Sequence, residues 1–481
     1  MVAMVLQVYN TLSRSKEEFR PRNGMHVDMF VCGLTPYDDA HLGHAKTFIS
    51  FAIAVRWLRR LGYDVKYVQN ITDIEDKIIA RAKERGISPS ELEGNYEKRF
   101  FEDMEALGIK GDVDMYPRSH DYIDAIKEQI QLLIDRGYAY ELQGDIYYDV
   151  AKFPSYTKLS GVKLEELERH RIEPKEGKVN SYDFALWKAS KDGEPSWDAR
   201  FTFNGKEKEL PGRPGWHIED TAMTHEIFGP QYDLHGGANE LIFTHHSNEI
   251  AQAEAAYGIS PFVKYWMHSG VLNVNDMKMS KSLKNFVTIR DALSNFDAEV
   301  LKLFVASTHY RKNINYTEAL MKEAKMRLNY LYAAFSVFYS MKEAKSSTRD
   351  AEVISMAENL KREFTEAMND DFNTPLALSR LVVAINGLRA FAEANGQVGS
   401  AAKHEMVDTV LGLASIFGIL GHDTYKQSLP EEAHALINER EKLRKEKRFK
   451  ESDDLRDKLK REYGLVLEDT EYGTVWYKEG V

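Results

Sequence analysis

Cysteine is almost absent from this chain: Cys32 is the single cysteine among 481 residues. One cysteine excludes any disulfide within the chain and is typical of proteins in a reducing compartment. Long hydrophobic runs are also missing, since no stretch of about 18 consecutive apolar residues occurs, and a membrane-spanning helix is therefore not expected. Residues 1–10 lack the basic segment and the small-residue cleavage site of a secretory signal. These absences predict a cytoplasmic protein without a membrane partner.

Positive charge is in deficit, because 64 Lys and Arg stand against 75 Asp and Glu, for a formal net charge of −11. This balance argues against a generally basic nucleic-acid-binding surface, but it leaves a local basic patch open. Short-period repeats and low-complexity tracts are lacking as well. The remaining composition, with 43% hydrophobic and 29% charged residues, is that of a globular protein. Its length suggests about three domains.

The first strong local pattern is a strand followed by a helix and a second strand. Residues 27–32 are largely apolar and end at Gly33, and a turn containing Pro36 follows. Apolar residues then recur three and four positions apart from 45 to 61, which predicts a helix, and residues 65–68 form a second strand. Such a unit is typical of a parallel, doubly wound sheet. We therefore expect an α/β fold.

The rest of the chain divides into segments of different character. From 120 to 214, short strands mix with polar, proline-bearing loops, which indicates an insertion between two halves of the sheet. Strand and helix patterns resume from 215 to about 290. Residues 316 to about 418 are nearly all helix-forming, and the tail from about 425 combines a charged helical pattern with a short strand.

A histidine motif, His41-Leu42-Gly43-His44, lies between the predicted first strand and helix. Backbone N–H groups and the helix dipole favour an anion at such a point. Gly43 allows a backbone or a ligand to approach closely, and each histidine can donate a hydrogen bond to a phosphate oxygen. Taken alone, the motif is equally consistent with a helix start that happens to carry two histidines.

A lysine motif follows much later in the chain, at Lys278-Met279-Ser280-Lys281-Ser282. Two ammonium groups in a short loop can stabilise the charge on a phosphate that is being transferred. Taken alone, the motif is best interpreted as a solvated lysine loop. The occurrence of both motifs in this order favours one nucleotide site assembled from the two halves of the fold.

The two motifs resemble the HIGH and KMSKS signatures of class I aminoacyl-tRNA synthetases, whose Rossmann core makes an aminoacyl-adenylate from ATP and an amino acid. Further strings are similar to those of the cysteinyl-tRNA synthetases: Cys32–Tyr37, Asn70–Lys77, Asp183–Lys188, Gly215–Glu219, His235–Gly237 and His245–Glu249. The resemblance extends over essentially the whole chain. It implies that ATP, accompanied by Mg²⁺, is a substrate.

The resemblance also implies roles for individual residues. It assigns the stabilisation of the reacting phosphate to His41, His44, Lys278 and Lys281. ATP binding falls on Leu42, Gly43, His44 and Lys281. The pocket for the substrate cysteine is expected to be lined by Gly33, Thr72, Trp216, His235 and Glu240. Glu240 stands where the family usually has an aspartate that holds the substrate ammonium, so the charge is kept and the side chain is one methylene longer.

A metal site is indicated by His245 and Glu249, which are four residues apart and share one face of a predicted helix. Such a pair is either half of a zinc site or a core histidine beside a surface glutamate. The family binds zinc with two cysteines, a histidine and a glutamate, and these positions fall on Cys32, Asp220, His245 and Glu249. Asp220 therefore replaces a cysteine. We expect one Zn²⁺ per chain; an empty site, or another metal chosen by the harder ligands, stays open.

The C-terminal tail is rich in basic residues between 440 and 461, but acidic residues alternate with them. This composition alone is consistent with a salt-bridged, solvated pair of helices. The resemblance implies an anticodon-binding domain here, in which Trp476 and nearby arginines are suited to stack on single-stranded bases.

Together with the resemblance, the segments predict this division: 1–119 and 215–290 as the two halves of the Rossmann catalytic domain, 120–214 as the connective insertion, 291–320 as a stem-contact region, 321–424 as an all-α helical bundle, and 425–481 as a small α/β anticodon-binding domain. The resemblance implies a monomeric enzyme that activates cysteine with ATP and transfers it to the 3′ end of tRNA(Cys). Two alternatives remain: a cysteine ligase of thiol biosynthesis acting on an amino-sugar, and an inactive RNA-binding paralogue.

Overall fold

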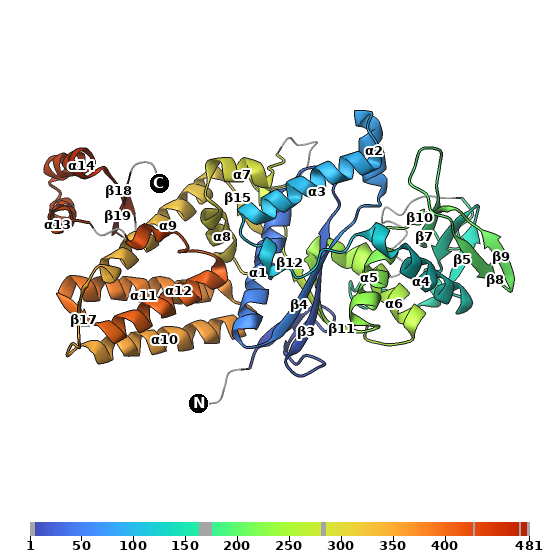
Figure 1. Cartoon of the computed structure of the whole chain (residues 1–481), viewed down its shortest axis with the longest axis horizontal. Coiled ribbons are helices and arrows are strands. Elements are labelled where there is room, and N and C mark those ends of the chain that lie inside the picture. The colour runs from blue at the N-terminus through green and yellow to red at the C-terminus, as the bar shows by residue number, and fades with distance from the viewer. Residues whose placement is uncertain (1–4, 163–175, 280–284, 427–428, 471–472, 479–481) are drawn as a thin grey trace.

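The computed structural model has a parallel four-stranded sheet at its centre, with the strand order β12-β11-β3-β4 (Figure 1). Its strands are β3 (His26–Leu34), β4 (Asp64–Ile71), β11 (Tyr232–Ala238) and β12 (Val263–Ser269). All neighbours in this sheet run parallel, which confirms the expected α/β fold. The structure describes residues 5–162, 176–279, 285–426, 429–470 and 473–478.

The first crossover of the sheet is α1 (Leu42–Arg60), which connects β3 to β4. Its buried face carries apolar residues at helical spacing, including Phe48, Phe51, Ala52, Val55 and Leu58, as the periodicity predicts. Other helices of this part are α2 (Asp76–Arg85), α3 (Pro89–Ala106), α5 (Ile218–Phe228), α6 (Ser247–Tyr257), α7 (Ile289–Asn295) and α8 (Ala298–Ala306).

The segment inserted between the two halves of the sheet folds around its own antiparallel sheet, in the order β10-β7-β6-β5. It consists of α4 (Ile123–Asp135), β5 (Ala139–Leu142), β6 (Asp145–Tyr148), β7 (Phe184–Ala189), the hairpin β8 (Arg200–Phe203) and β9 (Lys206–Glu209), and β10 (Gly212–Pro214). Ile130, Tyr148 and Trp187 of this segment share one hydrophobic core with Ala222 of α5 and Ala251 of α6. The insertion is therefore packed firmly beside the crevice of the parallel sheet.

Two small sheets flank the main one. The hairpin of β1 (Gln7–Asn10) and β2 (Ser15–Glu18) precedes the main sheet. A three-stranded sheet in the order β14-β13-β15 follows it, formed by β13 (Leu272–Val274), β14 (Met277–Lys278) and β15 (Ile314–Tyr316). The lysine motif begins at the end of β14, so this sheet positions it.

Four long helices form a bundle after the α/β part: α9 (Glu318–Tyr339), α10 (Asp350–Asn369), α11 (Thr374–Ala394) and α12 (Ser400–Phe417). The short strand β16 (Lys342–Ala344) lies between α9 and α10, and β17 (Gln397–Gly399) lies between α11 and α12; the two strands pair in parallel. Within the described residues, α11 is the one helix that is long and apolar enough to cross a membrane by length and composition. It packs against α9 and α10 in the bundle.

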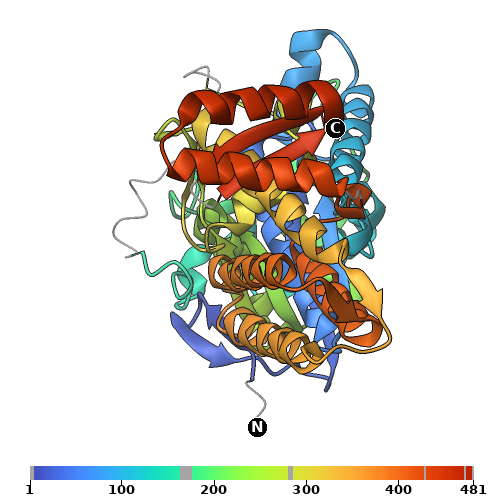
Figure 2. The same ribbon diagram turned by 90° about the vertical axis from the view of Figure 1, so that its left-hand side faces the viewer.

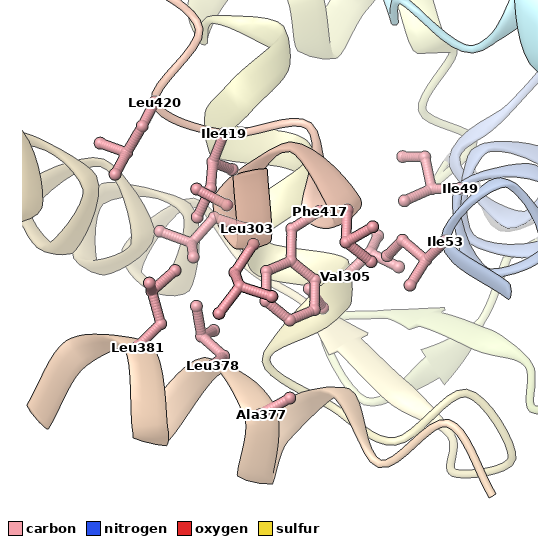
Figure 3. Close-up of a cluster of buried hydrophobic side chains, with 14 of the residues drawn as sticks. Ile49, Ile53, Leu303, Val305, Ala377, Leu378, Leu381, Phe417, Ile419 and Leu420 are labelled. Carbon is pink, nitrogen blue, oxygen red and sulfur yellow. The ribbon is translucent and has the colours of Figure 1, made fainter. Parts of the chain in front are cut away.

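The bundle and the parallel sheet share a continuous hydrophobic core (Figure 3). Ile49 and Ile53 come from α1, Leu303 and Val305 from α8, and Phe417 from the end of α12. Each such side chain stabilises the fold by about 1.5–3 kcal/mol when fully buried. The bundle is therefore joined to the helix that carries the histidine motif.

The C-terminal part is a pair of helices, α13 (Glu431–Lys445) and α14 (Phe449–Tyr463), followed by a hairpin of β18 (Leu465–Thr470) and β19 (Gly473–Lys478). Figure 2 shows the two helices side by side across the hairpin. The expected small α/β domain is thus present. Arg440 of α13 is buried here, with 1% of its side chain exposed, and forms two 2.7 Å hydrogen bonds with the carboxylate of Asp469.

Candidate active site

The N-terminus of α1 is capped by the two histidines of the histidine motif. His41 Nδ1 accepts a hydrogen bond from the backbone N–H of His44 at 3.3 Å, and His44 Nδ1 accepts one from the N–H of His41 at 3.2 Å. The two rings stack with their centroids 3.8 Å apart. Since Nδ1 of each ring is an acceptor, a neutral ring carries its proton on Nε2. Each histidine is thereby fixed as an Nε2–H donor.

The pKa of His44 lies well below its ordinary value, because the ring is buried and because the charges of His41 and Lys77 oppose its protonation. At pH 7 the His44 ring is therefore neutral. The neutral ring keeps Nδ1 as the acceptor of the cap hydrogen bond and leaves the Nε2–H group to donate to an anion at the N-terminus of the helix.

Gly43 and Leu42 contribute to the motif in different ways. A Cβ atom at Gly43 would lie 2.8 Å from Cε1 of His41. Only glycine at this position leaves room for the His41 ring to lie over the first turn of α1. The side chain of Leu42 is fully buried, and its backbone N–H donates to the carbonyl of Val287 at 3.1 Å. Leu42 therefore anchors the motif in the core, and its side chain does not face a ligand.

The lysine motif lies against the start of α1. Met279 approaches within 3.6 Å of where a Cβ of Gly43 would be, and Thr288, which follows the motif, forms a β-bridge with His41. Lys278 is exposed at the end of β14. Lys281 falls in 280–284, outside the described residues. The two motifs meet at one place, as the sequence predicts.

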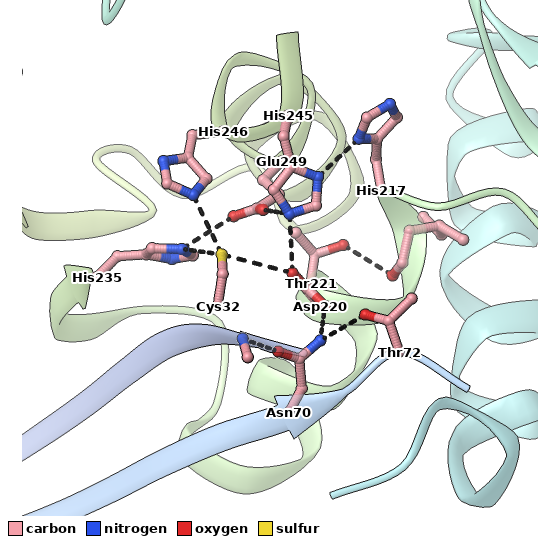
Figure 4. Close-up of polar contacts among 12 residues, drawn as sticks. Cys32, Asn70, Thr72, His217, Asp220, Thr221, His235, His245, His246 and Glu249 are labelled. Carbon is pink, nitrogen blue, oxygen red and sulfur yellow. Dashed lines mark hydrogen bonds and ion pairs between the residues drawn. The ribbon is translucent and has the colours of Figure 1, made fainter. Parts of the chain in front are cut away.

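A second cluster lies at the carboxyl end of β3, where the Cys32 thiol is surrounded by four groups (Figure 4). Its Sγ is 3.1 Å from His246 Nε2, 3.4 Å from His235 Nε2 and 3.9 Å from Asp220 Oδ2. His245 Nε2 completes the cluster, 3.0 Å from Asp220 Oδ2. Burial, together with the charge of Glu249, raises the pKa of the thiol, so without a cation it stays protonated.

The Glu249 carboxylate is fully buried beside the thiol. Neither of its oxygens accepts a well-formed hydrogen bond from the part of the chain that the structure describes. The nearest nitrogens are His245 Nε2 at 2.8 Å and His235 Nε2 at 3.5 Å. Burial raises the pKa of this carboxyl, and the charge of His245 opposes the rise. A buried carboxylate without donors is costly unless a cation neutralises it, so the cluster fits a metal ion.

Two sets of four ligands are close enough to hold one ion, and they share Cys32 and Glu249. One set adds Asp220 and His245, and the other adds His235 and His246; within each set all ligand atoms lie within 4.8 Å of one another. The first is the set that the sequence predicts. His246 is a ligand candidate that the sequence reasoning missed, although the His245-His246 doublet is visible in the sequence.

Hydrogen bonds to residues outside the cluster fix the orientation of these rings. Asn70 donates to Asp220 Oδ1 at 2.6 Å and accepts a hydrogen bond from the backbone N–H of Gly33 at 2.7 Å. His246 Nδ1 lies 2.8 Å from His268 Nε2, and His245 Nδ1 lies 2.8 Å from His217 Nδ1. Partners of this kind fix which ring nitrogen is free for a metal. The sequence reasoning assigned no role to these supporting side chains: Asn70, His217 and His268.

The residues predicted to line the cysteine pocket gather around this cluster, with one difference. Thr72 accepts a hydrogen bond from Asn70 at 3.2 Å, and the Trp216 ring stacks on His245 with centroids 4.4 Å apart. His235 Nε2 lies 3.4 Å from the Cys32 thiol, and Gly33 is the residue after Cys32 in the chain. Glu240 instead forms an ion pair with Lys278, so it lies beside the lysine motif.

The C-terminal helices present an exposed aromatic ring among cations. Phe449, at the start of α14, is 54% exposed, and the Arg444 guanidinium lies 5.9 Å from the centre of its ring. Lys445, Lys447 and Lys450 around it are all exposed. The sequence predicts such a stacking role for Trp476, but this side chain is 9% exposed within the core of the C-terminal part. That prediction is wrong, because the strand pattern did not reveal which face is covered.

Comparison with known families accounts for most of the chain. Residues 18–326 match the family of class I (C) tRNA synthetase catalytic domains, residues 363–421 match the DALR domain, and residues 426–476 match the cysteinyl-tRNA ligase anticodon-binding domain. A cysteine–tRNA ligase of Thermococcus gammatolerans is 42% identical over 98% of this chain and 99% of the relative. One of Syntrophotalea carbinolica is also 42% identical, over 98% and 99%.

The chain belongs to the cysteine–tRNA ligase family. Membership places it among the ATP-dependent aminoacyl-tRNA ligases and confirms the resemblance that its motifs indicate. The two alternatives, an amino-sugar ligase and an inactive paralogue, gain no support from these relatives.

Solved structures show how far the fold of the family is shared. The methionyl-tRNA synthetase of Mycobacterium tuberculosis in complex with methionyl-adenylate superposes with a TM-score of 0.57 at 15% identity, over 82% of this chain and 89% of that one. A putative arginyl-tRNA synthetase of Campylobacter jejuni gives a TM-score of 0.52 at 15% identity, over 82% and 94%. At this identity the likeness concerns the fold, and it confirms the class I architecture.

Proposed function

We propose that this chain joins cysteine to tRNA(Cys) in two steps at the crevice between the histidine motif and the Cys32 cluster. In the first step a carboxylate oxygen of cysteine attacks the α-phosphorus of ATP, and the bond to pyrophosphate breaks. In the second step a hydroxyl at the 3′ end of the tRNA attacks the carbonyl carbon, and AMP leaves. The observation that carries the proposal is the buried thiol–histidine–carboxylate cluster at the carboxyl end of β3, the strand that leads directly to the histidine motif at the start of α1.

The residues of the two motifs act on the phosphates. His41 and His44 donate their Nε2–H groups to phosphate oxygens, and Gly43 lets the nucleotide approach the helix N-terminus. Lys278 and Lys281 stabilise the charge of the pentavalent phosphorus and of the leaving pyrophosphate. Mg²⁺ accompanies ATP into the site and leaves with pyrophosphate. Glu240, paired with Lys278, is the candidate that holds the ammonium of the substrate.

A zinc ion fits the cluster around Glu249. We infer that it is held by Cys32, Asp220, His245 and Glu249, since an imidazole, a thiolate and carboxylates are all zinc ligands. When bound, the ion supplies a Lewis acid that takes the thiolate of the substrate cysteine as a ligand. Gly33, Thr72, Trp216 and His235 enclose the side chain and keep water from it.

Discrimination against serine is the reason for a metal in such a pocket. Cysteine and serine differ only in sulfur against oxygen, a difference that a purely hydrophobic pocket distinguishes poorly. A thiol loses its proton far more readily than a hydroxyl, because its pKa is lower, and the thiolate is the better metal ligand. The pocket therefore rejects serine during binding.

The tRNA is bound along the whole chain in this proposal. The exposed ring of Phe449 and the cations around it are suited to an unpaired anticodon base and the neighbouring phosphates. We keep the predicted division of the chain, with 291–320 against the acceptor stem and 425–481 at the anticodon. The proposed enzyme works as a monomer in the cytoplasm, where its tRNA is charged.

Exchange of radiolabelled pyrophosphate into ATP tests the first step. With Mg²⁺ kept in excess, we expect cysteine to drive the exchange and serine to drive it at least about 100-fold less. We also expect a chelator that is selective for Zn²⁺ over Mg²⁺ to abolish it. Absence of cysteine-dependent exchange would overturn the proposed activity. Exchange that survives the removal of zinc, with Mg²⁺ still present, would overturn the zinc assignment alone.

A further inference from the structure

Lys77 is a charged residue of the Asn70–Lys77 segment, and the function proposed so far gives it no role. It lies in the first turn of α2, and its Nζ is 5.7 Å from the ring centres of both Tyr37 and Trp216. An ammonium within about 6 Å of an aromatic face is attracted by the ring quadrupole. The two rings come from the turn after β3 and from the segment before α5, so they hold the cation between two distant parts of the chain.

This position lies between the two halves of the active site. On one side, Trp216 stacks on His245 of the thiol cluster, with centroids 4.4 Å apart. On the other side is Tyr37, which lies in the segment that leads from β3 to His41. The charge of Lys77 also contributes, after burial and the charge of His41, to the lowered pKa of His44. The carboxylate of cysteine and the α-phosphate of ATP have to meet between these two sides.

The charge of Lys77 is available to a ligand. Among the residues that the structure describes, its Nζ forms no ion pair, whereas Lys188 and Arg213 both pair with Asp76, the residue before it. The Lys77 side chain is also exposed. An unpaired ammonium at the mouth of a crevice attracts anionic substrates.

We propose that Lys77 binds the anionic oxygens that react during activation, namely the cysteine carboxylate and the non-bridging oxygens of the α-phosphate. This inference rests on the proposed function. As the carboxylate oxygen bonds to phosphorus and the electron pair of the breaking bond leaves with pyrophosphate, negative charge stays on the non-bridging oxygens. Lys77 remains protonated throughout and stabilises this charge electrostatically. Lys278 and Lys281 serve the leaving pyrophosphate.

Pyrophosphate exchange with three full-length variants tests the role of Lys77. Lys77→Gln removes the charge, Lys77→Arg keeps it, and Lys83→Gln removes a matched charge on the exposed side of the same helix. We expect Lys77→Gln to lower kcat/KM for cysteine by about 100-fold, as the loss of one charge-stabilising donor does in other enzymes. Lys77→Arg should recover at least about a tenth of the activity, and Lys83→Gln should stay within about twofold of the parent, since it removes no active-site charge.

Cysteamine distinguishes the two anionic groups, because it carries the thiol and the ammonium of cysteine but lacks the carboxylate. If Lys77 binds the carboxylate before reaction, Lys77→Gln raises the KM for cysteine and leaves inhibition by cysteamine unchanged. If it acts on the α-phosphate as charge develops, kcat falls and the KM for cysteine stays the same. Either pattern supports the inference and identifies the oxygen concerned.

Three results would overturn the inference. The first is exchange by Lys77→Gln within about threefold of the parent, as expected of an uninvolved surface lysine, and the second is no recovery of activity in Lys77→Arg. The third is that Lys77→Gln weakens inhibition by cysteamine as much as it weakens the use of cysteine, which would mean that Lys77 only shapes the pocket through Trp216. Metal content and the unfolding midpoint are measured for each variant, and Lys77→Met replaces the glutamine variant if that one is unstable. Loss of cysteine-dependent exchange in the parent chain would instead overturn the proposed function.

Discussion

At the scale of single residues, Asp220 is the proposed metal ligand that distinguishes this chain. In the proposed site it supplies an oxygen where the resemblance to the family implies a sulfur, and its two oxygens have different partners. Oδ1 accepts a hydrogen bond from Asn70, and Oδ2 lies near His245 and Cys32. Only Oδ2 is therefore left to bind a metal, and Asn70 fixes its direction.

Replacement of Asn70 tests this arrangement. Asn70→Ala removes the hydrogen bond that orients Asp220, and we expect metal affinity to fall about 10- to 100-fold, as the loss of such supporting partners does elsewhere. Competition with a coloured chelator measures the affinity. Asn295→Ala, on the exposed surface of α7, is the control. Equal affinities for the two variants would show that Asp220 needs no support from Asn70 or does not bind the metal.

Replacement of Gly43 tests the histidine cap. In Gly43→Ala the new Cβ would lie 2.8 Å from the His41 ring, so the ring has to move and the reciprocal cap of α1 is lost. We expect a loss of stability of about 1 kcal/mol and a decrease in exchange of about 100-fold. Thermal unfolding and pyrophosphate exchange measure the two effects. His41→Asn should keep the cap but lose the activity; a fully active variant of either kind would contradict the assigned role.

At the scale of elements, α12 connects the bundle to α1 through Phe417 (Figure 3). Phe417→Ala leaves a cavity between the bundle and α8, and we expect a loss of about 3–5 kcal/mol in the free energy of unfolding. Because the core is continuous, the bundle and the α/β part should still unfold in one transition. Denaturant titration followed by tryptophan fluorescence and by circular dichroism tests both expectations. Two separated transitions in the parent chain would contradict a continuous core.

The C-terminal helices depend on the ion pair between Arg440 and Asp469. The guanidinium hydrogen bonds hold the pKa of Asp469 below its ordinary value. A lowered pKa means that the pair stabilises the fold above the unfolded-state pKa of about 3.9, and that this stabilisation is lost as the pH falls through the folded-state value. Protection of the α13 amides against hydrogen exchange, measured relative to the intrinsic rate at the same pH, should therefore fall below about pH 4.

Asp469→Asn separates this effect from general acid unfolding. At pH 7 it leaves Arg440 buried without its counter-charge, which costs about 3–5 kcal/mol. Protection of the α13 amides, relative to the intrinsic rate, should then be low already at neutral pH and should change little between pH 3 and 7, a range in which the protection in the parent changes. An unchanged exchange rate at pH 7 would show that the pair does not hold the C-terminal part together.

At the scale of the whole molecule, local sequence patterns predict most elements. The strand–helix–strand unit before residue 71 follows from apolar spacing, and the helical character of 316–418 follows from its helix-forming composition. The separation of α10 from α11 was not predicted. The meeting of the two motifs was predicted from their occurrence together in this order, although the lysine motif begins in a separate small sheet. The metal ligand set came from the resemblance to the family, since His245 and Glu249 alone are consistent with a core histidine beside a surface glutamate.

What the sequence did not predict depends on contacts between distant residues or on burial. Asn70 and Asp220 are far apart in the chain, and no spacing rule connects them. Phe449 stands among charged residues in the sequence and Trp476 in a short strand pattern, and the fold alone decides that the tryptophan is buried and the phenylalanine exposed. The ion pair of Glu240 with Lys278 likewise depends on the position of β14.

The most direct test of the account is the attachment of radiolabelled cysteine to a tRNA(Cys) transcript by the purified full-length chain with ATP and Mg²⁺. The account predicts that cysteine is attached to the 3′ end of this tRNA, that serine is not, and that removal of zinc with Mg²⁺ still present stops the reaction. Cysteine-dependent pyrophosphate exchange without any cysteine on the tRNA would contradict it, because the chain would then activate cysteine for a different acceptor.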